Sequence, residues 1–200
     1  SLARFRARND PNSAGNIGFY LADETQLAGR PDLTRKVLMV MREVLPLHPS
    51  YDRQAEIIIS KLEFVNKPAP ELTVSDLADK PVKIEDYQGK VVLVDFWGTF
   101  CGPCIRQFPQ MKETYAEFKD KGFEIIGISA DASQEQVTEF QKEGQLPWKL
   151  AMSISDDQAT QDRYLVESFP STFLIDQEGN VIAVDLSAET LDKVIRKLLQ

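Results

Sequence analysis

The sequence predicts an α/β fold, a three-layer sandwich with a mixed central sheet and a small helical region ahead of it. An almost continuous apolar run at 91–96 is typical of a central strand that is covered on both faces. Strand patterns then alternate with helical periodicity. Near the end, apolar segments at 172–176 and 181–185 flank the turn 177–180, which favours an antiparallel hairpin.

The first third of the chain is predicted to be helical. Apolar residues recur at helical spacing over 31–45, and prolines separate this pattern from a second periodic stretch over 50–65. The stretch 66–70 contains two prolines and is the predicted linker. We therefore expect two domains, a helical region over 1–66 and an α/β domain over 67–200.

Hydrophobic periodicity also places the remaining elements of the α/β domain. Weak strands at 71–74 and 82–84 would form a hairpin, and the central strand follows them. The next helix has an apolar stripe from Ile105 to Phe118 and stops at Gly122. The remaining elements, in chain order, are a strand at 123–129, a helix at 134–142, an extended segment at 148–152, a helix at 156–164, the terminal hairpin, and a last helix with a stripe from Leu191 to Leu199.

Charge and hydropathy exclude two classes of partner. The net charge is −8, and residues 67–200 carry 14 basic and 23 acidic groups, since 9 of the 23 basic and 8 of the 31 acidic groups lie in residues 1–66. An acidic domain repels phosphate, so we expect no nucleic-acid partner. No apolar run approaches the roughly 20 residues of a membrane span. No signal-like segment opens the sequence, so we expect that any signal or anchor is removed or never existed.

The chain has two cysteines, Cys101 and Cys104, and one histidine, His48. Structural zinc needs four cysteine or histidine ligands, which this set does not supply without carboxylates. A cysteine hydrolase needs a histidine beside its nucleophile, whereas His48 lies in a proline-flanked turn. We expect no metal and no cofactor.

Both cysteines belong to the motif Cys101-Gly102-Pro103-Cys104, between the central strand and a helix. This placement directs the free N–H groups and the positive end of the helix dipole at the Cys101 sulfur, which stabilises a thiolate. Because the thiolate is the nucleophile of disulfide exchange, we predict that Cys101 attacks and that Cys104, one turn in and more buried, resolves. Pro103 suits the first helical turn. The alternative is a local structural disulfide.

Residues 67–200 resemble the thioredoxin superfamily, and within it the TlpA/ResA-like thiol-disulfide oxidoreductases related to the AhpC/TSA group. The resemblance rests on VVLVDFWGTFCGPC at 91–104, GFEIIGIS at 122–129 and FPSTFLID at 169–176. The segment 130–166 resembles the helical insertion of TlpA-like proteins. The resemblance implies a thioredoxin-like three-layer sandwich.

The resemblance also implies a substrate-binding surface around the dithiol. Pro170 resembles the family's cis-proline, which faces the dithiol and offers backbone groups to a substrate peptide, and Trp97 and Phe100 resemble the aromatic residues that border the site. The expected substrate-binding residues are Trp97, Phe100, Gly102, Pro103 and Phe169. Two alternatives stay open: a trans-proline that ends a loop, and core packing for Trp97.

Three positions depart from the family pattern. Phe100 stands where tryptophan is usual, which should reshape the groove. Gln107 stands where ResA-like members often carry a glutamate that tunes thiol acidity. Leu165 stands where a glycine is common before the cis-proline loop, so the backbone there is in question.

Asp95 lies six residues before Cys101, where thioredoxins carry a buried aspartate and many TlpA/ResA-like relatives carry asparagine. Its strand should be covered on both faces, which would bury the carboxyl and raise its pKa. We predict that Asp95 accepts the Cys104 proton and so completes a catalytic set with Cys101 and Pro170. The alternative is an aspartate at a strand end that reaches solvent.

Residues and resemblance together predict a thiol-disulfide oxidoreductase that reduces disulfides of partner proteins. The resemblance implies protein substrates with disulfides or dithiols, an upstream thiol donor such as a membrane electron-transfer protein, and a periplasmic or other extracytoplasmic location in a bacterium; a cytoplasmic location is the alternative. Two other functions stay open: a peroxiredoxin, although its Pro-x-x-x-Thr-x-x-Cys pattern is missing, and an adaptor or chaperone module with a vestigial dithiol.

Overall fold

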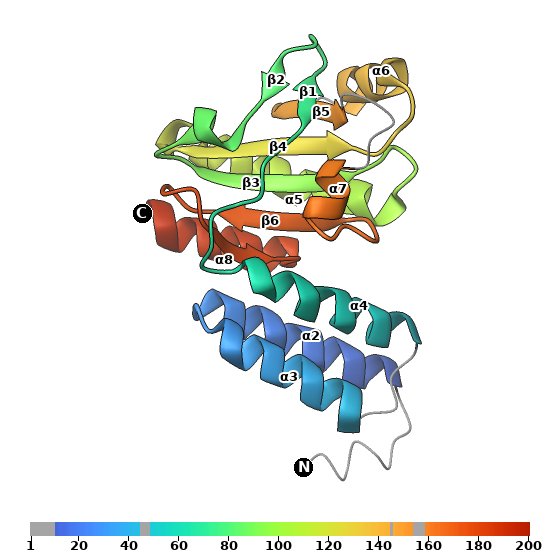
Figure 1. The fold of residues 1–200 in the computed structure, drawn as a ribbon, viewed down its shortest axis with the longest axis vertical. Coiled ribbons are helices and arrows are strands. Elements are labelled where there is room, and N and C mark those ends of the chain that lie inside the picture. The colour runs from blue at the N-terminus through green and yellow to red at the C-terminus, as the bar shows by residue number, and fades with distance from the viewer. Residues whose placement is uncertain (1–10, 45–48, 145, 154–158) are drawn as a thin grey trace. The chain divides into compact units, whose positions relative to one another are not determined.

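The computed structural model describes residues 11–44, 49–144, 146–153 and 159–200 (Figure 1). The chain divides into two compact units, residues 1–63 and 64–200. The division lies close to the linker expected at 66–70. His48 and the start of the helix expected at 156 lie outside the described residues.

The described part of the N-terminal unit is helical. It contains α2 (Pro11–Leu27), α3 (Pro31–Val44) and α4 (Pro49–Lys61), and the 3-10 turn η1 (Leu62–Phe64) follows. Helices α3 and α4 confirm two predictions, whereas α2 is not apparent in the sequence pattern because glycines are unfavourable in a helix interior. A Cβ at Gly18 would lie only 1.8 Å from Met41 Sδ, so this glycine allows α2 and α3 to pack closely.

The C-terminal unit is built on a seven-stranded sheet with the order β2-β1-β5-β4-β3-β6-β7. The strands are β1 (Val74–Asp76), β2 (Pro81–Val82), β3 (Val91–Trp97), β4 (Phe123–Ser129), β5 (Lys149–Ser153), β6 (Ser171–Ile175) and β7 (Val181–Val184). Strands β3, β4 and β5 are parallel and the other neighbouring pairs antiparallel, so the sheet is mixed as predicted. Every residue of β3 is buried, which confirms a strand covered on both faces.

The first hairpin forms, but its boundaries differ from the prediction. Strand β1 begins only at Val74, because the Thr73 N–H donates to Thr160 Oγ1 at 2.9 Å instead of to a neighbouring strand. Asp76 Oδ1 then accepts backbone N–H groups from the turn that follows. Strand β2 ends at Val82, since the next residues form the 3-10 turn η2 (Ile84–Tyr87).

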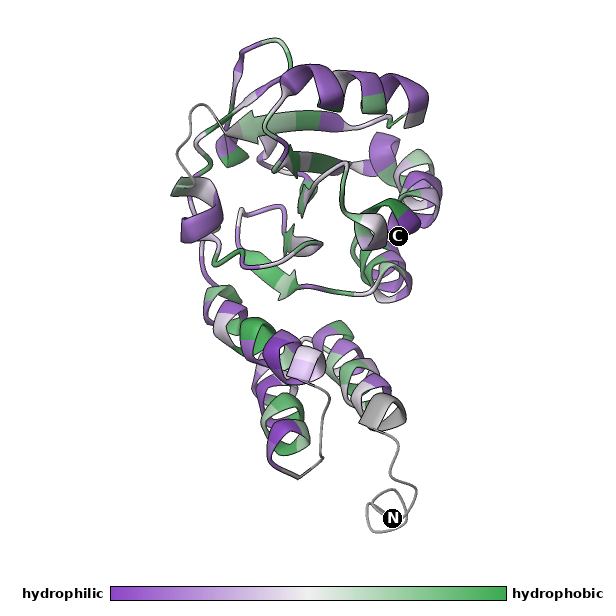
Figure 2. Cartoon of the chain, turned by 90° about the vertical axis from the view of Figure 1, so that its right-hand side faces the viewer, coloured by the Kyte–Doolittle hydropathy of each residue, from purple (hydrophilic) through white to green (hydrophobic). Residues whose placement is uncertain are grey.

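Helices on both faces of the sheet complete three layers. They are α5 (Gly102–Phe118), α6 (Gln134–Gly144), α7 (Ala159–Arg163) and α8 (Ala188–Leu199). In Figure 1, α5 and α8 lie behind the sheet and α7 lies in front of it. Thr114 of α5 donates a hydrogen bond to Asp192 of α8 at 2.9 Å, which joins these two helices. The helices carry hydrophobic and hydrophilic sides, as the colouring in Figure 2 shows.

Aromatic side chains fill the core on both faces of the sheet. Phe96 packs against Tyr164, with ring centroids 5.3 Å apart, on the face where α7 lies. Trp97, the next residue of β3, points to the opposite face and packs against Phe108 of α5 at 5.3 Å. The end of β3 is therefore held from both sides, and the loop toward the cysteines begins from a rigid support.

Candidate active site

The dithiol lies at the junction of β3 and α5. Cys101 is the N-cap residue of α5, and Cys104 lies in its first turn. The two sulfurs form a disulfide, with their Cα atoms 5.3 Å apart. Cys101 is 6% exposed and Cys104 is 1% exposed, so Cys101 is the more accessible of the two cysteines. This is the order of exposure that the predicted roles require.

Helix α5 directs its N-terminus at Cys101 Sγ. The backbone N–H of Cys104 donates to this sulfur at 3.2 Å. Pro103, in the same turn, has no N–H that would need a partner. A donor at a helix N-terminus stabilises a negatively charged sulfur more than a neutral thiol. Once the disulfide is reduced, the site therefore favours a thiolate at Cys101.

Asp95 is buried inside the sheet. The residue is 2% exposed, and it lies in register with Gly127 of β4 and Thr172 of β6. Burial raises the pKa of its carboxyl to about 7. The prediction of a buried Asp95 is confirmed, and the alternative of a carboxyl that reaches solvent is wrong. Alternation along β3 places Asp95 on the same face as Trp97, the face that α5 covers, and a pKa near 7 suits a group that accepts and returns a proton.

The loop before β6 contributes a cis-proline and an aromatic ring. The Phe169–Pro170 peptide bond is cis, so the alternative of a trans-proline is wrong. The ring of Phe169 lies 6.1 Å from the ring of Phe100 in an edge-on arrangement. Phe100 is 66% exposed. The exposed Phe100 ring and the half-buried Phe169 ring form an apolar rim, which we call the Phe100–Phe169 rim, next to Cys101 in the chain.

Trp97 does not belong to this rim. It is fully buried, and its ring packs against Phe140 at 5.2 Å as well as against Phe108. The expected substrate-binding role of Trp97 is therefore wrong, because a large ring on a covered strand contributes more by core packing. Gly102 and Pro103, in contrast, are exposed at the start of α5.

The two other departures from the family pattern have different consequences. Leu165 adopts a φ of 51°, in the left-handed region that glycine adopts without strain. Its N–H donates to the carbonyl oxygen of Asp162 at 3.1 Å and closes the end of α7. The glycine-like backbone is retained although the residue is leucine. Gln107 is half-buried on α5 and supplies no carboxyl there.

One acidic group that contacts the loop before Cys101 is missing from the sequence-based predictions. Asp131 follows the end of β4 by two residues, just as Thr99 follows the end of β3. The N–H and the hydroxyl of Thr99 donate to the two carboxylate oxygens of Asp131 at 2.9 and 2.5 Å. Strands β3 and β4 are parallel with Trp97 and Ser129 in register, so equal spacing after the two strands is the signal that could have identified this pair.

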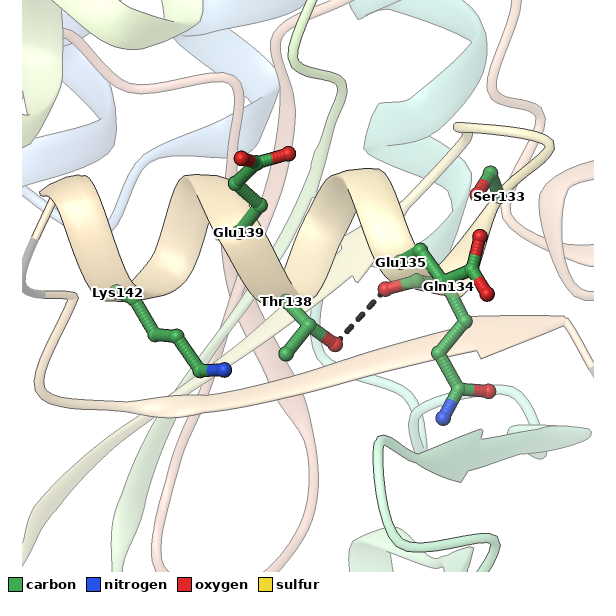
Figure 3. Close-up of a pocket in the computed structure, with 6 residues that line it drawn as sticks. All are labelled: Ser133, Gln134, Glu135, Thr138, Glu139 and Lys142. Carbon is green, nitrogen blue, oxygen red and sulfur yellow. Dashed lines mark hydrogen bonds between the residues drawn. The ribbon is translucent and has the colours of Figure 1, made fainter.

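A surface depression of about 720 Å³ lies along α6 and does not involve the dithiol. The residues that line it are Ser133, Gln134, Glu135, Thr138, Glu139 and Lys142 (Figure 3). The Thr138 hydroxyl donates to the Gln134 carbonyl oxygen at 2.8 Å and is used within the helix. Over the ranges that the structure describes, no group of three or more His, Cys, Asp or Glu side chains could hold a metal ion. The same ranges contain no helix with the length and apolar character to cross a membrane.

Thioredoxin-fold proteins place a Cys-x-x-Cys pair in this way, at the start of a helix that covers a mixed sheet, with a cis-proline loop close by. The C-terminal unit is of this class. Residues 65–184 match the AhpC/TSA family, and the chain belongs to it.

Similar proteins narrow the chemistry to thiol-disulfide exchange. The thiol-disulfide oxidoreductase ResA of Bacillus cereus (strain ZK / E33L) is 36% identical over 132 residues, which cover 65% of this chain and 74% of that protein. The thioredoxin domain of a thiol-disulfide oxidoreductase from Bacteroides vulgatus is 34% identical with a TM-score of 0.64, over 68% of this chain and 98% of that one. A thiol:disulfide interchange protein from Bacteroides sp. is also 34% identical, with a TM-score of 0.63, over 68% and 90%. The chain is a thiol-disulfide oxidoreductase with its Cys-x-x-Cys pair at 101–104.

Proposed function

We propose that the chain reduces disulfides of partner proteins through the Cys101-Gly102-Pro103-Cys104 dithiol. The observation that carries this proposal is the 3.2 Å hydrogen bond from the Cys104 N–H to Cys101 Sγ, because it stabilises the attacking thiolate of a reduced site. The Gly-Pro pair between the cysteines, which also occurs in reducing thioredoxins, supports the reductive direction.

The reaction proceeds by two attacks of sulfur on sulfur. The Cys101 thiolate attacks one sulfur of the substrate disulfide, a mixed disulfide forms, and the other substrate sulfur leaves as a thiolate that takes a proton from solvent. Cys104 then gives its proton to the Asp95 carboxylate and attacks Cys101 Sγ. The Cys101–Cys104 disulfide forms as the bond from Cys101 to the substrate breaks, and the remaining substrate sulfur leaves as a thiolate that takes a proton from solvent, while Asp95 returns its proton to solvent. Two electrons thus pass from the dithiol to the substrate.

The proposed substrates are proteins, and the Phe100–Phe169 rim would hold an extended segment next to the dithiol. An upstream thiol donor has to return the disulfide to the dithiol after each turnover. The proposed location is extracytoplasmic, where protein disulfides form and persist. Fractionation of the source cells with an antibody to the chain tests it, and recovery only with cytoplasmic proteins would contradict it.

Insulin reduction in dithiothreitol, followed by turbidity, tests the activity. We expect the full chain to accelerate precipitation and the Cys101→Ser variant to lose the effect. Peroxide consumption without insulin reduction would indicate a peroxiredoxin, and no effect in either assay would indicate an adaptor. Equilibration with dithiothreitol buffers tests the direction: we expect a reduction potential nearer to about −270 mV than to about −120 mV, and the reverse would overturn the reductive direction.

A further inference from the structure

We propose that Asp131 is a positioning residue of the exchange site, which acts through Thr99 to hold the loop that carries Phe100 and Cys101. We call the Asp131 carboxylate, together with the Thr99 and Ser129 groups that donate hydrogen bonds to it, the Asp131 clamp. The proposal rests on the proposed function only in taking Cys101 as the attacking thiol.

The Asp131 clamp joins the loops that leave two neighbouring strands. Asp131 Oδ1 accepts the Thr99 hydroxyl at 2.5 Å, and Asp131 Oδ2 accepts the Thr99 N–H at 2.9 Å and the Ser129 hydroxyl at 2.7 Å. The Asp131 N–H in turn donates to Ser129 Oγ at 3.0 Å, and Ser129 is 3% exposed. Hydrogen bonds that involve a carboxylate are roughly twice as strong as neutral ones. The clamp thus attaches the middle of the cysteine loop to the rigid end of β4.

The conformation of the loop depends on this attachment. At its start, the Trp97 carbonyl oxygen accepts the Ala130 N–H at 2.9 Å, and at its end the Cys101 N–H donates to the Gly98 carbonyl oxygen at 3.0 Å. Between these points Thr99 donates its hydrogen bonds to Asp131. The ring of Phe100 lies over Gly98, and a Cβ added at Gly98 would be only 2.6 Å from this ring. The clamp therefore sets the positions of both the thiol and the Phe100–Phe169 rim.

The clamp matters most in the reduced protein. In the oxidised protein the bond to Cys104 restrains Cys101 covalently. After reduction, the position of the Cys101 sulfur depends on the first turn of α5 and on the loop that Thr99 attaches to Asp131. Attack on a bound disulfide requires alignment at about 3–3.5 Å, whereas a small reagent in solution can approach from many directions. Loss of the clamp should therefore slow reaction with a protein disulfide more than alkylation.

Matched variants of the full chain test the proposal. Asp131→Ala removes the clamp and Thr99→Val removes its hydroxyl. Thr99→Ser keeps the hydroxyl, and Asp131→Asn keeps one oxygen that can accept the Thr99 N–H, with an amide NH2 that can donate to the Thr99 hydroxyl in place of the second acceptor. Asp176→Ala is the control, because Asp176 Oδ1 accepts the N–H groups of Glu178 and Asn180 at 3.0 and 2.8 Å in the β6–β7 turn. The measurements are the rate of mixed-disulfide formation with insulin in the Cys104→Ser background, and the rate of iodoacetamide alkylation from pH 5 to pH 9.

We expect Asp131→Ala and Thr99→Val to slow mixed-disulfide formation by about 10- to 100-fold with an unchanged pH profile of alkylation. Thr99→Ser and Asp176→Ala should stay within about threefold of the parent protein, and Asp131→Asn should lie between the parent protein and Asp131→Ala, because a neutral amide keeps weaker hydrogen bonds to Thr99. Equal losses in both reactions would overturn the proposal, as would an Asp131→Asn variant as slow as Asp131→Ala or a slow Asp176→Ala control. If Asp131→Ala does not fold, the comparison of Thr99→Val with Thr99→Ser tests the proposal by the same two rates. Failure of the parent protein to form a mixed disulfide would contradict the proposed function instead.

Discussion

Replacing Asp95 with asparagine should raise the free energy of unfolding by about 4 kcal/mol at pH 7 and slow the resolution of the mixed disulfide. Asp95 is 2% exposed, and burial raises the pKa of its carboxyl from the ordinary value of 3.8 to about 7. The folded protein therefore binds a proton more tightly at Asp95 than the unfolded chain does. Stability falls as pH rises from the unfolded pKa to the folded one, because ionisation favours the unfolded chain.

The magnitude follows from the two pKa values. Each tenfold difference in acidity corresponds to about 1.4 kcal/mol, so the full effect of a rise from 3.8 to about 7 is about 4 kcal/mol and is reached near pH 7. The same calculation predicts that Asp95→Asn raises the free energy of unfolding by about 2 kcal/mol at pH 5.5 and by less than about 1 kcal/mol at pH 4. Asparagine has nearly the same shape and does not ionise, so the difference between the two proteins should grow with pH over this range.

Urea unfolding from pH 4 to pH 8, followed by tryptophan fluorescence, measures this difference. The chain has 2 tryptophans, Trp97 and Trp148, and both are buried in the C-terminal unit, so the signal reports on the unit that contains Asp95. Asp120→Asn, at an exposed position, is the control and should change little. A stability difference between Asp95→Asn and the parent protein that is the same at pH 4 and pH 7 would refute the reasoning.

The role of Asp95 as the proton acceptor is tested by stopped-flow measurement of the rate at which Cys104 resolves a mixed disulfide at Cys101. An unchanged resolution rate in Asp95→Asn would show that Asp95 does not accept the Cys104 proton.

Three other outcomes follow from the structure. Cys104→Ser should accumulate a mixed disulfide at Cys101, and Cys101→Ser should not; mass spectrometry after incubation with an oxidised protein measures this, and trapping mainly through Cys104 would contradict the assigned roles. Leu165→Gly should raise the free energy of unfolding by about 1 kcal/mol, because it relieves the left-handed conformation, and an unchanged urea midpoint would contradict it. A fragment of residues 64–200, which keeps Phe64 with the C-terminal unit, should retain insulin reduction; loss of activity in a folded fragment would show that the first unit contributes to the site.

Local features of the sequence were sufficient for the frame of the C-terminal unit. The continuous apolar run at 91–96 identified β3, and the turn at 177–180 identified the hairpin of β6 and β7. The Cys101–Cys104 motif at a strand-to-helix junction indicated where the sulfurs lie and which would be more exposed. These features depend on backbone periodicity and on helix ends, which involve residues close together in the chain.

Packing between distant segments decided the rest. Helix α2 depends on Gly18 next to Met41, and the burial of Trp97 depends on Phe108 and Phe140 from other helices. The sequence by itself determined the dithiol and the strand that leads to it. Only the tertiary structure decided that Thr99 and Asp131 meet, because a hydrogen bond between two loops depends on the register of the parallel strands that carry them.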